Sequence, residues 1–272
     1  IPSTPNSIYV STTGSDSAAG TFAEPFATIA HAFSVATPGT SIYLRGGIYY
    51  QGEIHPGVSG TPGSPVVLRA YNGEEAVIDA ADPALVDTTW TTVQPEVYRH
   101  AFTASARNVT LVRKSDGEVF RSYMMGSSTE VIDESSEGRT FEQLLIDTAY
   151  CADGANLTIR VPAGSVIADY YVYAAIRNTG VYLESRNYIY FDGLTFRHFG
   201  ANDYNRAVYV YSSSDILIQN CDFLYCNLPI WIKNASDRVV IQDNYQIDDT
   251  ADWHFSYTKS QGVNYHGEVE TL

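Results

Sequence analysis

Three stretches of the chain, all lying between Arg186 and Ile247, share one pattern of apolar and polar positions. Each begins with a polar residue, continues through β-branched or aromatic residues, breaks at polar residues or glycine, and returns to an aromatic residue. The stretches are residues 187–196, 215–223 and 237–245. Phe191, Ile218 and Ile241 hold equivalent positions, so the pattern recurs after 27 and then 23 residues. Repeats of this length that are built from short strands are typical of solenoids.

The breaks within the three stretches predict how the chain turns. They fall at Asp192-Gly193, at Gln219-Asn220 and at Gln242-Asp243-Asn244. Asn, Asp and Gly tolerate the left-handed backbone that a sharp bend requires. No segment of helix length separates the copies, which argues against helix-containing leucine-rich repeats. We therefore predict an all-β fold, a right-handed parallel β-helix, in which each stretch supplies two short strands joined by a bend.

The first part of the chain predicts further coils of the solenoid and one helix. Short strands are expected at residues 7–10, 41–45, 65–70 and 76–79. Residues 25–36 carry apolar side chains at helical spacing, with Pro25 at the first helical position. Because a solenoid must cover its apolar ends, we expect this helix to cap the first coil.

The coil pattern is interrupted between residues 86 and 175. Polar alternation predicts antiparallel strands around Trp90 and Tyr98 and over residues 109–113, 118–120, 157–161 and 170–173. Residues 127–138 are acidic and serine-rich, and we interpret them as a loop. The whole segment is interpreted as a β-rich insertion that returns to the solenoid at Ile176 or Val181, either to bind substrate or as a decoration. The predicted organisation is a cap with the first coils (1–85), the insertion (86–175) and further coils (176–272).

The two ends of the sequence also carry expectations. A polar and aromatic excursion over residues 248–259 follows the third copy, and the chain then ends at Leu272 with no capping element. We therefore expect that the native polypeptide continues beyond Leu272 or that another chain covers this end. The chain starts at Ile1 rather than Met, so we also expect that a leader was removed.

A series of residues near the start carries a resemblance to a known family. It comprises Tyr9-Val10, Gly14-Ser15-Asp16, Gly20-Thr21, Pro25-Phe26, Thr28-Ile29, Ala32, Pro38-Gly39, Ile42-Tyr43, Arg45, Gly47 and Tyr49. The series resembles the N-terminal signature of secreted parallel β-helix proteins, which include pectate-lyase-like polysaccharide lyases and related glycosidases. Residues 189–244 are similar to later coils of that family. The resemblance implies a secreted β-helix that acts on polysaccharides, and it does not specify the reaction.

Composition and charge narrow the possible partners. In 272 residues, 21 Tyr and 11 Phe stand against 16 Lys plus Arg, which favours strands over helices. The net charge of −15 disfavours nucleic acid and anionic membranes, and an acidic substrate would need a local basic patch or a bridging cation. No apolar run reaches the ~18 residues of a membrane helix. Three cysteines cannot complete a disulfide framework, so burial of Cys221 is favoured and a Cys221–Cys226 link is the alternative.

Sugar-cleaving β-helices use one of two chemistries, and the first is that of a lyase. A lyase takes the proton beside a uronate carboxylate with a Lys or Arg base, and the candidates are Lys233, Lys259 and Arg206. Calcium would neutralise the acid of the substrate, and carboxylate oxygens are its preferred ligands. The candidate calcium ligands are Asp243, Asp248, Asp249 and Asp252. Solvated lysines and turn-capping Asp residues are the structural alternatives.

The second chemistry is hydrolysis, which needs one carboxylate as acid and another as base or nucleophile. Asp192, Asp222 and Asp243 recur near the bends and are candidates for a row of carboxylates, with the capping of bends as the alternative. Exposed aromatic side chains are candidates for stacking on sugar rings, with inward packing as the alternative. These aromatic residues are Tyr204, Tyr209, Tyr211, Trp231, Trp253 and Tyr257.

Taken together, the pattern and the resemblance predict an extracellular or cell-surface protein that acts on polysaccharide. The expected activity is that of a lyase or a glycoside hydrolase on an acidic, plant, algal or bacterial polymer, with Ca²⁺ as the expected cofactor. The sequence contains no clean copy of the catalytic phrase of the family lyases. A non-catalytic surface, adhesive or filament-forming solenoid is therefore the alternative function.

Overall fold

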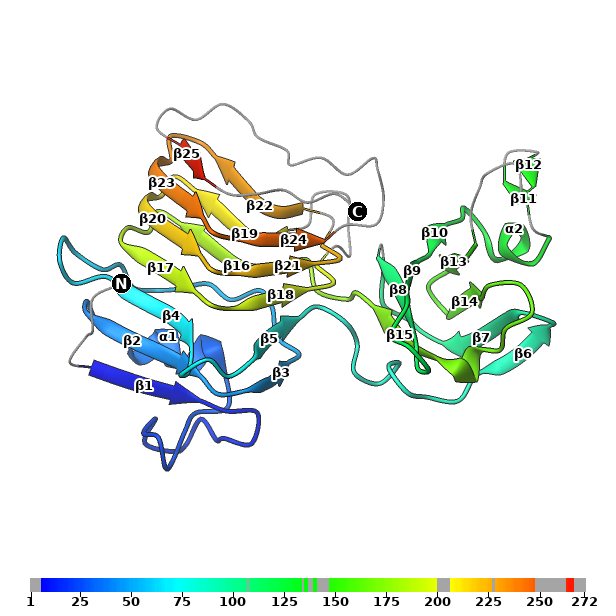
Figure 1. Cartoon of the computed structure of the whole chain (residues 1–272), viewed down its shortest axis with the longest axis horizontal. Coiled ribbons are helices and arrows are strands. Elements are labelled where there is room, and N and C mark those ends of the chain that lie inside the picture. Colours follow the sequence, from blue (N-terminus) through cyan, green and yellow to red (C-terminus); the bar gives the residue numbers. More distant parts are fainter. Residues whose placement is uncertain are drawn as a thin grey trace.

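The computed structural model describes residues 6–106, 108–133, 135–136, 139–140, 147–199, 206–226, 228–247 and 263–266. Three parallel sheets form the larger part of the molecule, which Figure 1 shows as a stack of coils. Sheet A contains β1 (Asn6–Val10), β2 (Thr40–Leu44), β4 (Val66–Ala70), β17 (Ile189–Asp192), β20 (Ser214–Gln219), β23 (Asp237–Gln242) and β25 (Val263–His266). Sheet B contains β3 (Gly47–Tyr49), β5 (Ala76–Asp79), β18 (Thr195–Arg197), β21 (Asp222–Leu224) and β24 (Tyr245–Ile247). Sheet C contains β16 (Thr179–Glu184), β19 (Arg206–Tyr211) and β22 (Leu228–Lys233).

The strand register confirms the repeat that the sequence predicts. Phe191 pairs with Ile218, Ile218 pairs with Ile241, and all three side chains are buried. The bends between sheets A and B also lie where the polar breaks predict them. Gly193, Asn220 and Asp243 have φ angles of 68°, 51° and 53°, in the left-handed region that these residue types tolerate.

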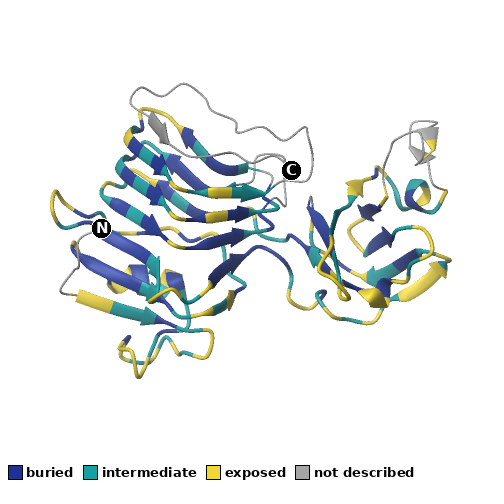
Figure 2. Cartoon of the chain, viewed as in Figure 1, coloured by how far each residue is buried: buried dark blue, intermediate teal, exposed yellow. Residues whose placement is uncertain are grey.

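The interior of the solenoid is a single apolar cluster to which all three sheets contribute, and Figure 2 shows its strands as mostly buried. Aromatic rings stack from coil to coil within it, as Phe196 and Phe223 do at a centroid distance of 5.3 Å. Cys221 is fully buried, as predicted. The alternative of a Cys221–Cys226 disulfide is wrong, because both thiols are free.

The helix near the start is shorter than predicted. α1 (Ile29–Val35) begins after Thr28, whose extended backbone and hydroxyl group, which accepts the His31 N–H, make it the N-cap. Pro25 therefore does not occupy the first helical position. The reason is that Phe26 continues a sheet by pairing with Val10, which holds the preceding residues extended. The buried side chains of α1 join the core of the solenoid.

Between β5 and β16 the chain forms a separate group of mostly antiparallel strands, seen apart from the coils in Figure 1. One sheet contains β6 (Thr91–Gln94), β7 (Val97–Ala101), β10 (Tyr123–Met124), β13 (Ala149–Ala152) and β14 (Asn156–Arg160). Another contains β8 (Val109–Arg113), β9 (Val119–Arg121) and β15 (Tyr170–Ala174), and a small one contains β11 (Ser135–Ser136) and β12 (Arg139–Thr140). A 3-10 helix, η1 (Ile167–Asp169), precedes β15. We call residues 82–174 the antiparallel segment; its buried side chains form apolar clusters distinct from that of the solenoid.

The prediction of a loop over residues 127–138 is wrong in part, because α2 (Ser128–Asp133) lies there. The Ser127 hydroxyl accepts the Glu130 N–H, and the Glu130 carboxylate accepts the Gly126 N–H. This arrangement resembles a capping box, and the Ser-x-x-Glu spacing was its sequence signal. No helix in the described part of the chain is long and apolar enough to cross a membrane.

Candidate functional site

A row of rings runs across the outer face of sheet C. Val181, Val208 and Ile230 point into the core, so their neighbours Tyr182, Tyr209 and Trp231 point outward. The strand register aligns these three residues, and their stacked rings lie 4.8 Å and 5.3 Å apart between centroids.

The row extends to a fourth coil through a residue from much earlier in the chain. The bridge between Ile54 and Val181 places His55 beside Tyr182, at a centroid distance of 5.2 Å with the rings edge to face. We call His55, Tyr182, Tyr209 and Trp231 the sheet C ladder.

Two cations lie against the ladder. The guanidinium carbon of Arg206 is 3.9 Å from the ring centroid of Tyr209 and 4.5 Å from that of Trp231. The ammonium nitrogen of Lys233 lies 5.0 Å from the Trp231 centroid. Such contacts are electrostatically favourable because the ring faces carry partial negative charge. A second outward row, formed by Glu184, Tyr211 and Lys233, runs beside the ladder in register.

Arg206 holds a positive charge that the described carboxylates do not pair. Its Nε is buried and has no hydrogen-bond partner among the described residues. The nearby Glu53 carboxylate instead accepts the backbone N–H groups of Asn178 and Thr179. Burial lowers the pKa of the Arg206 guanidinium from its ordinary value, and burial raises the pKa of the Tyr209 hydroxyl. The face thus combines apolar rings with a partly desolvated donor that can receive an anionic group of a ligand.

The structure brings two of the predicted catalytic residues together. Arg206 and Lys233 contact the same ring, that of Trp231, although 27 residues separate them in sequence. Tyr209, Tyr211 and Trp231 lie on the same face. The remaining candidate base, Lys259, and the remaining candidates for stacking on sugar rings lie outside the described residues. These aromatic residues are Tyr204, Trp253 and Tyr257.

The predicted carboxylates are not arranged in a row. Asp192 lies on sheet A, where it pairs with Arg69 at 2.7 Å and occupies the register position of Gln219. Asp222 lies on sheet B, where it is exposed and in register with Thr195. Asp243 occupies a bend. The three carboxylates separate because each stands at a different distance from its bend, so the register aligns each with a different residue type.

Of the predicted calcium ligands, only Asp243 lies within the described residues. Asp243 is exposed, and Asp248, Asp249 and Asp252 lie outside the described residues. Within the described part of the chain, no group of three or more His, Cys, Asp or Glu side chains is placed to hold a metal ion.

Sequence reasoning missed His55, Tyr182 and Glu184. A signal for two of them was present, because residues 181–184, 208–211 and 230–233 share an alternation of aliphatic and outward-facing residues. Their sequences are Val-Tyr-Leu-Glu, Val-Tyr-Val-Tyr and Ile-Trp-Ile-Lys. His55 had no such signal, because it reaches the ladder through a single bridge from a loop.

Comparisons with known proteins agree with this fold. The family described as "Pel9A-like, right handed beta helix region" matches residues 8–116, and "Right handed beta helix region" matches residues 140–269. Pectate lyase PEL9 of Emericella nidulans is 50% identical over 76 residues, which are 28% of this chain and 18% of that protein.

Solved structures extend the likeness to most of the chain. XylC in complex with xylose superposes with a TM-score of 0.67 at 16% identity, over 89% of this chain and 50% of that one. A glycoside hydrolase superposes with a TM-score of 0.58 at 14% identity, over 97% of this chain and 72% of that one. At such identities the likeness concerns the fold. The chain spans less than a fifth of PEL9 and half of XylC. With parallel sheets in stacked coils and two right-handed β-helix families matched over successive parts of the sequence, the chain belongs to the pectate-lyase-like superfamily of right-handed β-helix proteins, and its residues 8–116 match the Pel9A-like family.

Proposed function

We propose that the chain binds an acidic polysaccharide along the outer face of sheet C and cleaves it there. The observation that carries the proposal is the sheet C ladder with Arg206 and Lys233 against Trp231. Sugar rings present apolar faces that pack on aromatic rings, and the polar edges of both remain free to hydrogen-bond. The relatives named above include a pectate lyase and a xylose-bound protein, which supports a carbohydrate ligand.

The charge of the molecule supports an acidic polymer. The chain carries a net charge of −15, so an anionic polymer is repelled by most of its surface. Arg206 supplies local positive charge on the ladder. It forms no ion pair with a described carboxylate, so a ligand would not have to break such a pair in order to bind. We assign Arg206 to the carboxylate of a uronate residue, because a guanidinium forms strong, charge-assisted hydrogen bonds with carboxylates.

Elimination is the reaction that these residues favour over hydrolysis. Arg206 would neutralise the uronate carboxylate and so acidify the neighbouring carbon, and Lys233, after giving up its own proton to water, would take the proton from that carbon. The electron pair left behind forms the new double bond as the bond to the glycosidic oxygen breaks, and that oxygen takes a proton from water. Hydrolysis would need two carboxylates facing one another across the bond, whereas Asp192 and Asp222 lie on different sheets.

The test uses the full chain against a panel of uronate-containing and neutral polysaccharides. Lyase activity gives ultraviolet absorbance from the unsaturated uronate, with new reducing ends in equal amount. Trp231→Ala should weaken binding at least ~10-fold, as expected for an aromatic anchor that the bound ligand covers. Arg206→Ala should weaken binding of uronate polymers but not of neutral ones, and Lys233→Ala should abolish cleavage while retaining binding.

The matched control is Tyr43→Ala, which removes a stacked outward-facing ring from sheet A instead of sheet C. It should leave binding unchanged. Reducing ends without unsaturated product would identify a hydrolase, and binding without cleavage would identify a non-catalytic solenoid. Equal effects of Tyr43→Ala and Trp231→Ala on binding would exclude sheet C as the site.

Calcium belongs to the same proposal. We propose that Asp243 and the following acidic residues Asp248, Asp249 and Asp252 hold Ca²⁺, which would add positive charge for a uronate substrate. Pectate lyase PEL9 supports this proposal by likeness alone. Addition of excess chelator should lower both the melting temperature and the affinity for polysaccharide. An unchanged melting temperature would contradict a bound calcium ion.

We further propose that α1 caps the first coil of the solenoid. We also propose that residues 86–175 are an insertion beside the binding site, and that the protein is extracellular. The ends of the antiparallel segment support the second point, because Ala81 and Ala175 form a bridge with each other. A variant in which a short Gly-Ser linker replaces residues 82–174 should therefore still fold as a β-helix. Failure of that variant to give cooperative unfolding and a β-rich circular dichroism spectrum would contradict the boundaries. Detection in the culture medium of the source organism would test the location.

A further inference from the structure

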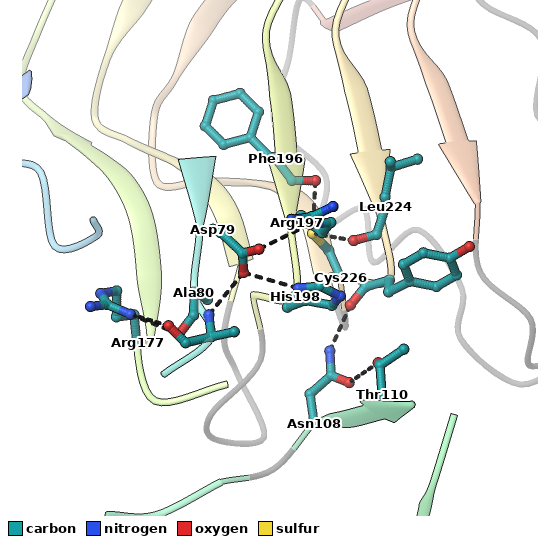
Figure 3. A network of polar contacts seen from close by, with 12 residues as sticks. Asp79, Ala80, Asn108, Thr110, Arg177, Phe196, Arg197, His198, Leu224 and Cys226 are labelled. Carbon is teal, nitrogen blue, oxygen red and sulfur yellow. Dashed lines mark hydrogen bonds and ion pairs between the residues drawn. The ribbon is translucent and has the colours of Figure 1, made fainter. Parts of the chain in front are cut away.

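A buried ionic cluster of the solenoid lies against the antiparallel segment, which contacts it through Tyr173. Asp79, at the end of β5, is fully buried and lies 2.9 Å from Nδ1 of His198, which is itself almost fully buried. The second carboxylate oxygen of Asp79 accepts a hydrogen bond from Nε of Arg197 at 2.9 Å. Figure 3 shows the three side chains facing one another between the coils and the antiparallel segment.

The ring of His198 is stacked between two tyrosines from different parts of the chain. Tyr173 of β15 lies 4.5 Å from it, nearly parallel, and Tyr225 of the next coil lies 6.0 Å away on a nearly parallel plane. Tyr173 belongs to the antiparallel segment, whereas Tyr225 belongs to the solenoid. We call Asp79, Arg197, His198, Tyr173 and Tyr225 the junction cluster.

Further contacts tie the two parts together around the cluster. The side-chain amide of Asn108 donates to the backbone carbonyl of Tyr225 at 2.6 Å. Arg177 donates to the carbonyls of Ala80 and Ala81, where the antiparallel segment begins. The Asn108 bond thus links the segment to the coil of Tyr225, and the Arg177 bonds link the two points at which the chain leaves and re-enters the solenoid.

Charge balance requires His198 to be neutral. A carboxylate accepts only, so Nδ1 of His198 carries a proton, and Nε2 has no partner among the described residues. Asp79 supplies one negative charge, which Arg197 already compensates. A proton on Nε2 would add a second positive charge to a closed space.

Burial and two nearby arginines oppose that charge, whereas Asp79 and the tyrosine ring faces favour it. Burial lowers the pKa of His198, as do Arg197 on β18 and Arg121 on β9, against the attraction of Asp79 on β5. Tyr173 on β15 and Tyr225 present ring faces. Close to Asp79 lie also the side chains of Tyr50 and Arg177. Burial alone would raise the pKa of the Asp79 carboxyl, but the hydrogen bond from His198 and the charge of Arg197 hold it below the ordinary value, so Asp79 stays ionised.

We propose that the Asp79–His198 pair, on which Tyr173 of the antiparallel segment packs, is an acid-sensitive clamp that holds the segment against the edge between sheets B and C. The segment leaves at the end of β5 in sheet B and returns at Thr179, the first residue of β16 in sheet C. Thr179 pairs with Arg206, so the clamped edge adjoins the sheet C ladder. The inference concerns the junction itself and stands whether or not the chain cleaves a polysaccharide.

The direction of the effect follows from linkage. In the closed junction the antiparallel segment packs on His198, and in the open junction it has moved away from this residue. Above about pH 6.5 the histidine is neutral in both forms, so pH does not change the balance between them. Below that value the open form binds a proton that the closed form excludes. The population of the open form should therefore rise up to about tenfold for each pH unit until the closed form is protonated as well.

The experiment is amide hydrogen exchange on the full chain between about pH 7.5 and 4.5, corrected for the intrinsic pH dependence of exchange. The first variant, His198→Asn, keeps a donor near the position of Nδ1 and cannot be protonated. Asn also tolerates the left-handed backbone of this residue, whose φ is 62°. The matched control, His100→Asn, removes a titratable ring elsewhere in the antiparallel segment.

The wild type and His100→Asn should lose protection in β8 and β15 as the pH falls, while β17 and β20 keep theirs. His198→Asn should show lower protection in β15 that does not vary with pH. The same pH dependence in His198→Asn, or equal losses in β15 and β17, would overturn the clamp. Should that variant not fold, the imidazole resonance of wild-type His198 decides the matter, since titration at or above pH 6.5 contradicts a proton-excluding site.

Discussion

Asp192 is either a catalytic carboxylate, as the sequence predicts, or a residue that stabilises the fold, and its replacement by alanine distinguishes the two roles. The residue is a predicted catalytic carboxylate, yet the structure places it on sheet A with its side chain only 10% exposed. It pairs with Arg69 at 2.7 Å and accepts hydrogen bonds from Gln219 at 3.1 Å and Asn220 at 2.8 Å. Asp192→Ala should therefore reduce stability and leave cleavage by the folded protein intact.

The size of the stability loss follows from the ion pair and the hydrogen bonds that are broken when the carboxylate is removed. Breaking a fully buried ion pair costs about 3–5 kcal/mol, and a hydrogen bond to a charged group is worth about 1.5–3 kcal/mol. The Arg69 side chain is 29% exposed and can recover part of its hydration, so the lower part of these ranges applies. We expect a loss of about 2–3 kcal/mol, which lowers the melting temperature of a chain of this size by roughly 4–12 °C.

The assay is urea unfolding followed by tryptophan fluorescence, with cleavage measured under conditions where each variant is folded. Asp222→Ala is the matched control, because Asp222 is an exposed predicted catalytic carboxylate one coil away. Its unfolding should stay within about 0.5 kcal/mol of the wild type. An Asp192→Ala protein with wild-type stability and no cleavage would refute the structural assignment and return Asp192 to the chemistry.

Three further predictions address the packing of the solenoid. Phe223→Ala removes a buried ring that stacks on Phe196, so urea unfolding should show a loss of about 3–5 kcal/mol, larger than for Asp192→Ala. Gly180→Ala places a Cβ 2.5 Å from the carbonyl oxygen of Ala207 on the next strand, so the melting temperature and the affinity for polysaccharide should both fall. Unchanged values would show that β16 and β19 lie further apart than in this structure. Burial raises the pKa of the Cys221 thiol to about 12, so iodoacetamide at pH 8.5 should modify it only in urea, and rapid labelling of the native chain would contradict its burial.

The antiparallel segment lies beside the proposed binding face of sheet C. The segment, the start of β19 and the junction cluster all meet the same edge of the solenoid. A ligand on the sheet C ladder would pass beside this edge at Arg206. Acid opening of the junction would therefore change one boundary of the proposed site without altering the ladder itself.

The amino-acid sequence by itself determined the coil repeat. Inward positions such as Phe191 and Ile218, and bends such as Gly193 and Asn220, follow from local periodicity and backbone preference, which need no knowledge of distant residues. The burial of Cys221 follows in the same way, because strand alternation places it inward. The strands β7, β8, β9, β14 and β15 were also predictable from alternation, whereas β13, which pairs with β14, was missed. The helix α2 was missed because its capping residues lie in a short polar stretch.

Only the tertiary structure decided which polar residues meet. Asp192 and Arg69 are far apart in sequence, as are Asp79 and His198, and they meet because parallel strands are added beside one another with a long segment between them. The same stacking brings His55 to Tyr182 and sets Arg206 and Lys233 on one tryptophan. Periodicity reports which way a side chain points, and the register between coils, which depends on the exact length of each connection, determines its neighbour.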